Sequence, residues 1–183
     1  MNDTLPILYL IVLIVLLGSA SWAVIRQIVR TRRIEGSLSR LQKKLNNEPG
    51  TAQERYQLGS IYLSKKLYTQ AISQFKKALK SKGLEGEENF ALIYNALGFA
   101  YAAQEQYDLA IRQYKECLKY QPDYITALNN LGFAYDKKNL TNQALEAYEE
   151  TLKYDPNNAT AKKRVNSLQK RVTTPSETPS ESK

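Results

Sequence analysis

A seven-residue phrase occurs twice in the chain, as Asn-Ala-Leu-Gly-Phe-Ala-Tyr at 95–101 and as Asn-Asn-Leu-Gly-Phe-Ala-Tyr at 129–135. The copies lie 34 positions apart, and downstream residues keep this offset: Ala110 and Ala144, Tyr114 and Tyr148, Pro122 and Pro156. A fixed period of this length is typical of repeat proteins, in which one helical hairpin cannot cover its own apolar face and stacks on the next. The period therefore predicts an all-α array.

Apolar residues within each unit have helical spacing. One helix face is predicted from positions i, i+3, i+4 and i+7, occupied by Tyr94, Leu97, Gly98 and Tyr101. A glycine inside a helix costs roughly 1 kcal/mol relative to alanine, so its recurrence at one position indicates that two helices press together there. Pro122 and Pro156 are expected to end the second helix of their units.

A weaker copy lies upstream, with Leu58, Gly59, Tyr62, Ala71, Phe75 and Ala78. Gly59 precedes Gly98 by 39 positions instead of 34, so five extra residues separate the first two units. We place them near 83–88, as a longer turn or as a lengthened following helix.

The repeated positions resemble the tetratricopeptide repeat (TPR) motif, W-x2-L-G-x2-Y followed by A-x3-F, A and P. The second and third units match it at Leu97, Gly98, Tyr101, Ala110, Tyr114 and Pro122, and at Leu131, Gly132, Tyr135, Ala144, Tyr148 and Pro156. The resemblance implies a TPR superhelix of three helical hairpins. A polar helix after the last repeat is expected to cap the stack. The predicted domain is 51–171, with repeats at about 52–85, 91–124 and 125–158 and the cap at 159–171.

Residues 5–25 carry no charge and are mostly Leu, Ile and Val. At about 1.5 Å per residue they reach roughly 30 Å, the thickness of a bilayer's hydrocarbon core. A single N-terminal transmembrane helix is therefore predicted after a short N-terminus of residues 1–4. A cleavable secretory signal is the alternative, since 18–21 are small residues. It is disfavoured because no Lys or Arg precedes the apolar run and four arginines follow it: Arg26, Arg30, Arg32 and Arg33.

These membrane-flanking arginines are expected to stay on the cytoplasmic side, or the stromal side in a plastid, with the repeats beside them. The basic juxtamembrane segment 26–50 also carries an apolar stripe at Ile34, Leu38, Leu41 and Leu45. The stripe either continues the membrane helix as a stalk, pairs with a second copy, or lies on the first repeat, which is the simplest reading. The oligomeric state is left open. The tail, 172–183, is expected to be disordered because it is almost entirely polar.

Composition argues against an enzyme and against a cofactor or metal site. The 183-residue chain has no histidine, which removes the commonest general base and a major metal ligand. Its one cysteine, Cys117, lies where the repeat requires a small buried residue. No phosphate-binding glycine loop is present. The 26 basic and 18 acidic residues form no stripe with a base-reading element, so nucleic acid is not an expected partner.

Binding of another protein is the remaining function. In the family that the chain resembles, a second face of each first helix lines a concave groove. The residues expected there include two phenylalanines one unit apart, flanked by amides able to bond an extended peptide: Tyr56, Leu92, Asn95, Phe99, Asn129 and Phe133. The alternative is that Phe99 and Phe133 are ordinary core residues.

Chaperone-binding members of this family clamp a partner's terminal carboxylate with Lys and Arg. The corresponding positions hold uncharged residues: Tyr56, Ser60, Ala96, Thr126 and Asn130. A chaperone's C-terminal tail is therefore not the expected ligand.

The N-terminal span, the arginine-rich exit and three repeats with an insertion after the first are similar to the photosystem I assembly-related TPR proteins of cyanobacteria and algal plastids. The resemblance implies a single-pass thylakoid protein whose stromal or cytoplasmic repeats bind photosystem I subunits or other assembly factors. Two further hypotheses stay open. One is a scaffold of a bacterial envelope complex, and the other is a regulatory subunit that recruits an enzyme.

Overall fold

The computed structural model describes residues 4–173, with side chains from Leu8 onward. These residues form eight helices and no strand, which confirms the predicted all-α class. They divide into two units, one up to Glu48 and one from Pro49. The predicted N-terminus 1–4 and disordered tail 172–183 lie mostly outside the described residues.

The first unit is one helix, α1 (Thr4–Asn47), which is long and apolar enough to cross a membrane. Its 44 residues correspond to about 66 Å at 1.5 Å per residue. The helix continues without a break through the juxtamembrane segment to Asn47. Large apolar side chains from Leu8 to Val29 are 44–70% exposed, as expected for a surface that requires lipid.

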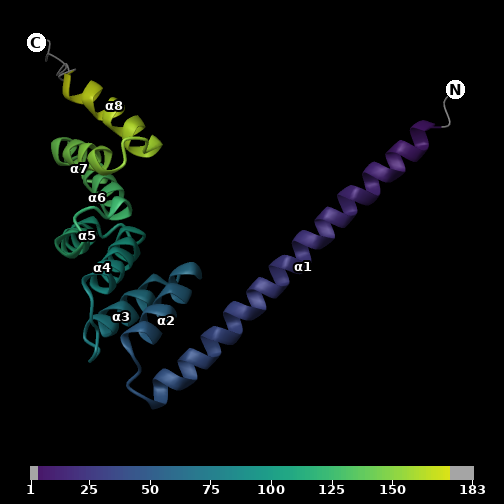
Figure 1. Cartoon of the computed structure of the whole chain (residues 1–183), viewed down its shortest axis with the longest axis horizontal. Coiled ribbons are helices and arrows are strands. Elements are labelled where there is room, and N and C mark those ends of the chain that lie inside the picture. The colour runs from purple at the N-terminus through teal and green to yellow at the C-terminus, as the bar shows by residue number, and fades with distance from the viewer. Residues whose placement is uncertain (1–3, 174–183) are drawn as a thin grey trace, which may run out of the picture. The chain divides into compact units, whose positions relative to one another are not determined.

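The second unit is a succession of antiparallel helix pairs (Figure 1). Its helices are α2 (Ala52–Ser64), α3 (Tyr68–Leu79), α4 (Glu87–Ala102), α5 (Tyr107–Tyr120), α6 (Ile125–Lys137), α7 (Thr141–Tyr154) and α8 (Ala159–Thr173). Thr51 starts the array with a capping box, because its hydroxyl accepts from the Glu54 amide while the Glu54 carboxylate accepts from the Thr51 amide. The turn inside each hairpin has a positive φ of 59° at the same repeat position, occupied by Lys66, Glu105 and Asn139.

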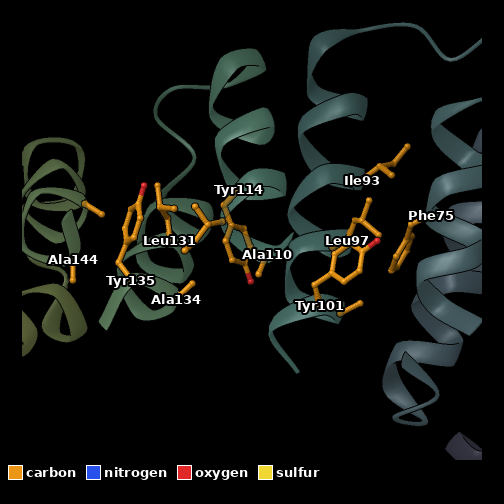
Figure 2. Packing of buried hydrophobic residues seen from close by; sticks show 14 of the residues in the cluster. Phe75, Ile93, Leu97, Tyr101, Ala110, Tyr114, Leu131, Ala134, Tyr135 and Ala144 are labelled. Atoms are coloured by element: carbon orange, nitrogen blue, oxygen red, sulfur yellow. The ribbon is translucent and has the colours of Figure 1, made fainter. Parts of the chain in front are cut away.

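The recurring glycines lie where two helices of a hairpin touch. A Cβ atom on Gly98 would come within 2.6 Å of the Tyr114 ring, and one on Gly132 within 2.9 Å of the Tyr148 ring. Gly59 meets Phe75 in the same way, at 2.6 Å. An aromatic ring from each second helix therefore occupies the space that the missing side chain leaves, as the spacing predicts. Figure 2 shows two of these rings, Phe75 and Tyr114, in one row of buried residues.

The five extra residues between the first two units are divided between a turn and a helix. The connection from α3 to α4 spans 80–86, whereas 121–124 suffices between α5 and α6. Gly83 and Gly86 have φ values of +78° and +82°, which side chains disfavour. In addition, α4 begins one turn earlier relative to its core glycine than α6 does. Both readings of the insertion are thus correct.

The last helix covers the end of the stack with one narrow apolar face. Ala161, Val165 and Leu168 are buried, whereas the remaining surface of α8 is largely basic and exposed. Asp136 of α6 accepts from Arg164 at 3.4 Å and from Arg171 at 2.9 Å. The carboxylate itself is only 13% exposed, so α8 is attached by charge as well as by apolar contact.

Candidate protein-binding groove

Six residues on the first helices of the hairpins make up the predicted groove, here called the groove stripe: Tyr56 on α2, Leu92, Asn95 and Phe99 on α4, and Asn129 and Phe133 on α6. Because 3.6 residues make one turn, a residue directly after the core glycine points about 100° away from it. The stripe therefore leaves the helix on a different side from the glycine–aromatic contact.

Phe99 and Phe133 are surface residues. Their side chains are 48% and 36% exposed, although the preceding glycines are buried. The alternative in which both are core residues does not match these exposures. Two neighbours hold the Phe133 ring in place. Its centroid lies 6.5 Å from that of Tyr107, in an edge-on arrangement, and the Lys137 ammonium lies 5.6 Å from the Phe133 centroid. An exposed ring held by neighbours is suited to anchoring a partner.

The amides of the stripe differ in their bonding. Asn95 accepts from the Asn130 side chain at 3.3 Å, so it ties α4 to α6. The carbonyl oxygen of Asn129, by contrast, is buried and has no hydrogen-bond partner among the described residues. An unpaired buried acceptor is costly, and because this oxygen is covered by the chain's own atoms, a ligand donor reaches it only if neighbouring side chains move. Asn95 is better described as a positioning residue.

A pocket of about 470 Å³ lies at the first junction, between α2, the 80–86 connection and α4. It contains Tyr56 and Leu92 of the groove stripe, and Leu84 and Ile93 add apolar wall. Gln53 and Asn89 supply amides, and Lys82 and Glu85 supply one charge of each sign. The inserted residues therefore enlarge the first part of the stripe into a cavity wide enough for side chains of a partner.

The sequence did not identify Leu84 and Asn89 as lining residues. The sequence feature that pointed to this region was the spacing of 39 residues, instead of 34, between Gly59 and Gly98. That spacing shows where extra residues lie along the chain, but it does not show which way they run in space. The path of the turn depends on the positive φ values at Gly83 and Gly86 and on the earlier start of α4.

The groove stripe contains no ionisable acid, base or nucleophile apart from the phenol of Tyr56. Asp136, one turn beyond Phe133, is already bonded to the arginines of α8. Cys117 is fully buried, and burial raises the pKa of its thiol from 9.0 to about 12. Such a thiol stays protonated at neutral pH and is a packing residue. The groove stripe can therefore bind a partner through apolar contacts and through hydrogen bonds between uncharged groups.

The four membrane-flanking arginines are exposed on α1, at Arg26, Arg30, Arg32 and Arg33. Arg26, Arg30 and Arg33 follow the i, i+4, i+7 spacing of one helix face. They lie directly after the exposed apolar run, at the depth where basic side chains meet lipid head groups if that run spans a bilayer.

Family models match three segments of the array. A model described as TPR repeat matches residues 100–139, and models described as tetratricopeptide repeat match 125–158 and 55–83. Among solved structures, the crystal structure of MamA superposes with a TM-score of 0.70 at 25% identity, over 77% of this chain and 80% of that one. These likenesses confirm the TPR fold, which is typical of proteins that bind other proteins rather than of enzymes.

Three curated relatives are similar to the chain, and one of them is described as chloroplastic. The uncharacterized protein ycf37 of Cyanophora paradoxa is 38% identical over 56% of this chain and 59% of its own length. The ycf37 protein of Guillardia theta is 38% identical over 70% of this chain and 72% of its length. The chloroplastic TPR domain-containing protein PYG7 of Arabidopsis thaliana is 37% identical over 65% of this chain but only 39% of its length. Because the chain has these repeats, packs a glycine against an aromatic ring in each hairpin and is similar to these relatives, it belongs to the ycf37 family of tetratricopeptide repeat proteins.

Proposed function

We propose that this chain is a membrane-anchored protein-binding factor that assists the assembly or stability of photosystem I at the thylakoid membrane. The observation that carries the binding role is the exposed, neutral groove stripe with Phe99 and Phe133 on a rigid repeat scaffold. The chloroplastic relative supports a plastid setting. The overall layout, an apolar helix followed by basic residues and three repeats, supports the photosystem I assignment by its similarity to assembly-related TPR proteins.

The mechanism that fits this arrangement is that of a membrane-tethered holdase, a protein that binds an exposed segment of another protein and keeps it from other contacts until assembly. An uncharged groove takes up an extended segment of a subunit that is exposed before assembly, and releases it when the subunit finds its final partner. The apolar part of α1, as a single span, holds the groove near the membrane and raises its effective concentration toward subunits inserted there. Nucleotide is not consumed, because the energy comes from competition between two binding partners.

The tether is tested by expressing residues 49–183 in a strain that lacks the full chain. We expect the fragment to fold, with unchanged helical circular dichroism, but to restore less photosystem I than the full chain. Replacing residues 5–25 by an unrelated span is the matched control and is expected to restore function. Full rescue by the soluble fragment would refute the role of the tether.

The identity of the bound protein, here called the client, is tested by mild crosslinking followed by affinity capture of the membrane-embedded chain. We expect photosystem I subunits or other assembly factors to be recovered with the native chain and to be depleted with Phe99→Ala/Phe133→Ala. Recovery of envelope components or of one catalytic partner, unchanged by these substitutions, would contradict the proposal.

The pocket at the first junction has a separate test. Leu92→Trp places a larger ring at the wall of the 470 Å³ cavity without removing a hydrogen bond. We expect weaker capture of the client with the same melting temperature. Leu67→Trp, at an exposed residue between α2 and α3 that does not line the pocket, serves as the control.

A further inference from the structure

The part of α1 that follows the apolar run is strongly basic. Residues 26–47 contain seven basic residues and one acidic residue, whereas the whole chain has 26 and 18. At about 100° per residue, only six positions of this segment lie within about 40° of Arg26 on the helix. Five of the six are basic and exposed, and Ser37 is the sixth. These five residues are here called the basic stripe: Arg26, Arg30, Arg33, Arg40 and Lys44.

The other charges of the segment lie on different faces of α1. Glu35 is about 180° from Arg26, and Arg32 and Lys43 are about 120° and about 100° away on one side. The apolar residues between 34 and 45 are centred about 90° away on the other side. Within α1, no acidic residue therefore shares the face of the basic stripe, which is about 27 Å long.

Lipid head groups account only for the near end of the stripe. α1 is one unbroken helix through this segment (Figure 1), so Arg40 and Lys44 lie about 21 Å and about 27 Å along its axis from Arg26. A typical tilt of about 20° for a membrane span brings them only slightly closer to the bilayer. The attraction of an anionic surface falls off over about 8 Å at physiological salt. The stripe nevertheless keeps the same face for three turns beyond Arg33.

We propose that the far part of the basic stripe, from Arg33 to Lys44, binds an acidic segment of another membrane protein that runs beside α1. A segment of this kind leaves the same bilayer and meets a row of positive charge where lipid no longer reaches it. The inference rests on the proposed function in one respect, since it takes the apolar part of α1 as a membrane span. The stripe lies on a different helix from the groove stripe, so it supplies a second, charge-selective contact.

The contact is expected to be reversible and sensitive to salt. Exposed ion pairs contribute little individually, so several must act together. Raising salt from about 0.1 M to about 1 M shortens the screening length from about 10 Å to about 3 Å, which removes most of the attraction. Confinement of both proteins to one membrane compensates by raising their local concentration.

Photocrosslinking in native membranes tests which class of molecule lies beside the stripe. A photoreactive phenylalanine analogue replaces Ser37 in one full-length chain and Ser39 in another, because Ser39 points about 160° away on the same helix. We expect Ser37 to give intermolecular products whose crosslinked segment is rich in Asp and Glu, and Ser39 to give far fewer. Products with lipid or nucleic acid, products with segments that lack acidic residues, or no intermolecular product at all would overturn the proposal.

Charge reversal tests the cause, with a control matched in charge and residue type. Full-length chains in neutral lipid vesicles are titrated with a fluorescent helical peptide that carries glutamates at i, i+4, i+7 and i+11. Arg40→Glu/Lys44→Glu is expected to weaken binding about tenfold or more, because two attractions become repulsions. Arg32→Glu/Lys43→Glu changes the net charge equally but lies off the stripe, so we expect less than about a threefold loss.

Equal losses in the two variants, with native helical circular dichroism in both, would show that net charge alone attracts the peptide and would overturn the proposed stripe. Adding anionic lipid to the vesicles is expected to leave peptide binding nearly unchanged, and loss of binding there would also overturn the proposal. Client capture that depends on Phe99 and Phe133 is measured in parallel. If it persists while the Ser37 products are missing, the stripe fails and the groove function stands, and the reverse result separates the opposite case.

Discussion

Gly98 and Phe99 are neighbours in α4, yet they belong to two different surfaces of the array. Gly98 is buried against Tyr114, where even a methyl group would collide, whereas Phe99 leaves nearly half of its ring in water. The same contrast recurs one unit later at Gly132 and Phe133. A rotation of about 100° between successive residues thus separates the contact that builds the repeat from the face that is free to bind.

The largest expected effect comes from alkaline pH, which charges buried groups of the inner surface. Burial raises the pKa of Cys117 from 9.0 to about 12 and that of Tyr148 from 10.0 to about 12, and it raises the pKa of Tyr114 further. Since the folded-state values lie above the unfolded ones, their stabilisation is complete below about pH 9 and is lost as pH rises toward 12.

We expect fragment 49–183 to unfold cooperatively in this range, as followed by circular dichroism. Cys117→Ala removes one of the titrating groups and should make the loss of stability between pH 9 and 12 less steep. A slope identical to that of the unmodified fragment would show that the thiol is not coupled to folding.

A substitution at the glycine–aromatic contact comes next. Gly98→Val places new carbons where the Tyr114 ring lies, and overpacking of this kind typically costs about 1–3 kcal/mol of unfolding free energy. Urea denaturation of fragment 49–183 measures the change. Adding Tyr114→Leu to Gly98→Val makes room for the valine, so the double variant should lose less than the sum of the two single losses. Additive losses would show that the two residues do not press together.

The attachment of α8 is expected to have a smaller effect. Asp136→Asn removes the charge that Arg164 and Arg171 share, at a cost of about 1 kcal/mol or less because both arginines are partly exposed. Hydrogen exchange should quicken in α8 before it does in α6. Asp108→Asn is the matched control, since this carboxylate is far more exposed and pairs with Lys138. Uniform exchange along the array would contradict a separate opening of the cap.

The smallest effect on stability is expected from the outer aromatic residues. Phe99→Ala should lower the free energy of unfolding by less than about 1 kcal/mol, compared with about 3–5 kcal/mol for a fully buried phenylalanine. Leu97→Ala, two residues earlier and only 2% exposed, should cost about 2–5 kcal/mol by the same measurement. Similar losses in the two variants would place Phe99 in the core after all.

Much of this arrangement follows from spacing in the chain. The 34-residue period predicts the hairpins, and the uncharged run at 5–25 predicts an N-terminal apolar helix, because helix periodicity and bilayer thickness are local physical constraints. The offset of 39 locates the insertion. The pocket that the insertion forms was not predictable, since its walls come from α2, the 80–86 connection and α4 together.

The roles of the two asparagines in the groove stripe were not predictable from the sequence either. Asn95 and Asn129 occupy one repeat position, so their sequence environment predicts one role for both. In the folded chain Asn95 accepts from Asn130, while the Asn129 carbonyl oxygen is buried without a partner among the described residues. The residue one unit after Asn130, where a partner for Asn129 would stand, is Arg164, which donates to Asp136 instead. One substituted neighbour is enough to give equivalent residues different roles.

The sequence by itself determined the type, number and order of the helices and the recurrence of glycine opposite an aromatic ring, because these depend on residues close together along the chain. Only the tertiary structure decided which amide oxygen lacks a hydrogen-bond partner, how far each phenylalanine is exposed, and where a cavity opens. Those properties depend on neighbours supplied by adjacent hairpins. Hydrogen bonding and burial are settled by distances in space, and periodicity along the chain does not specify those distances.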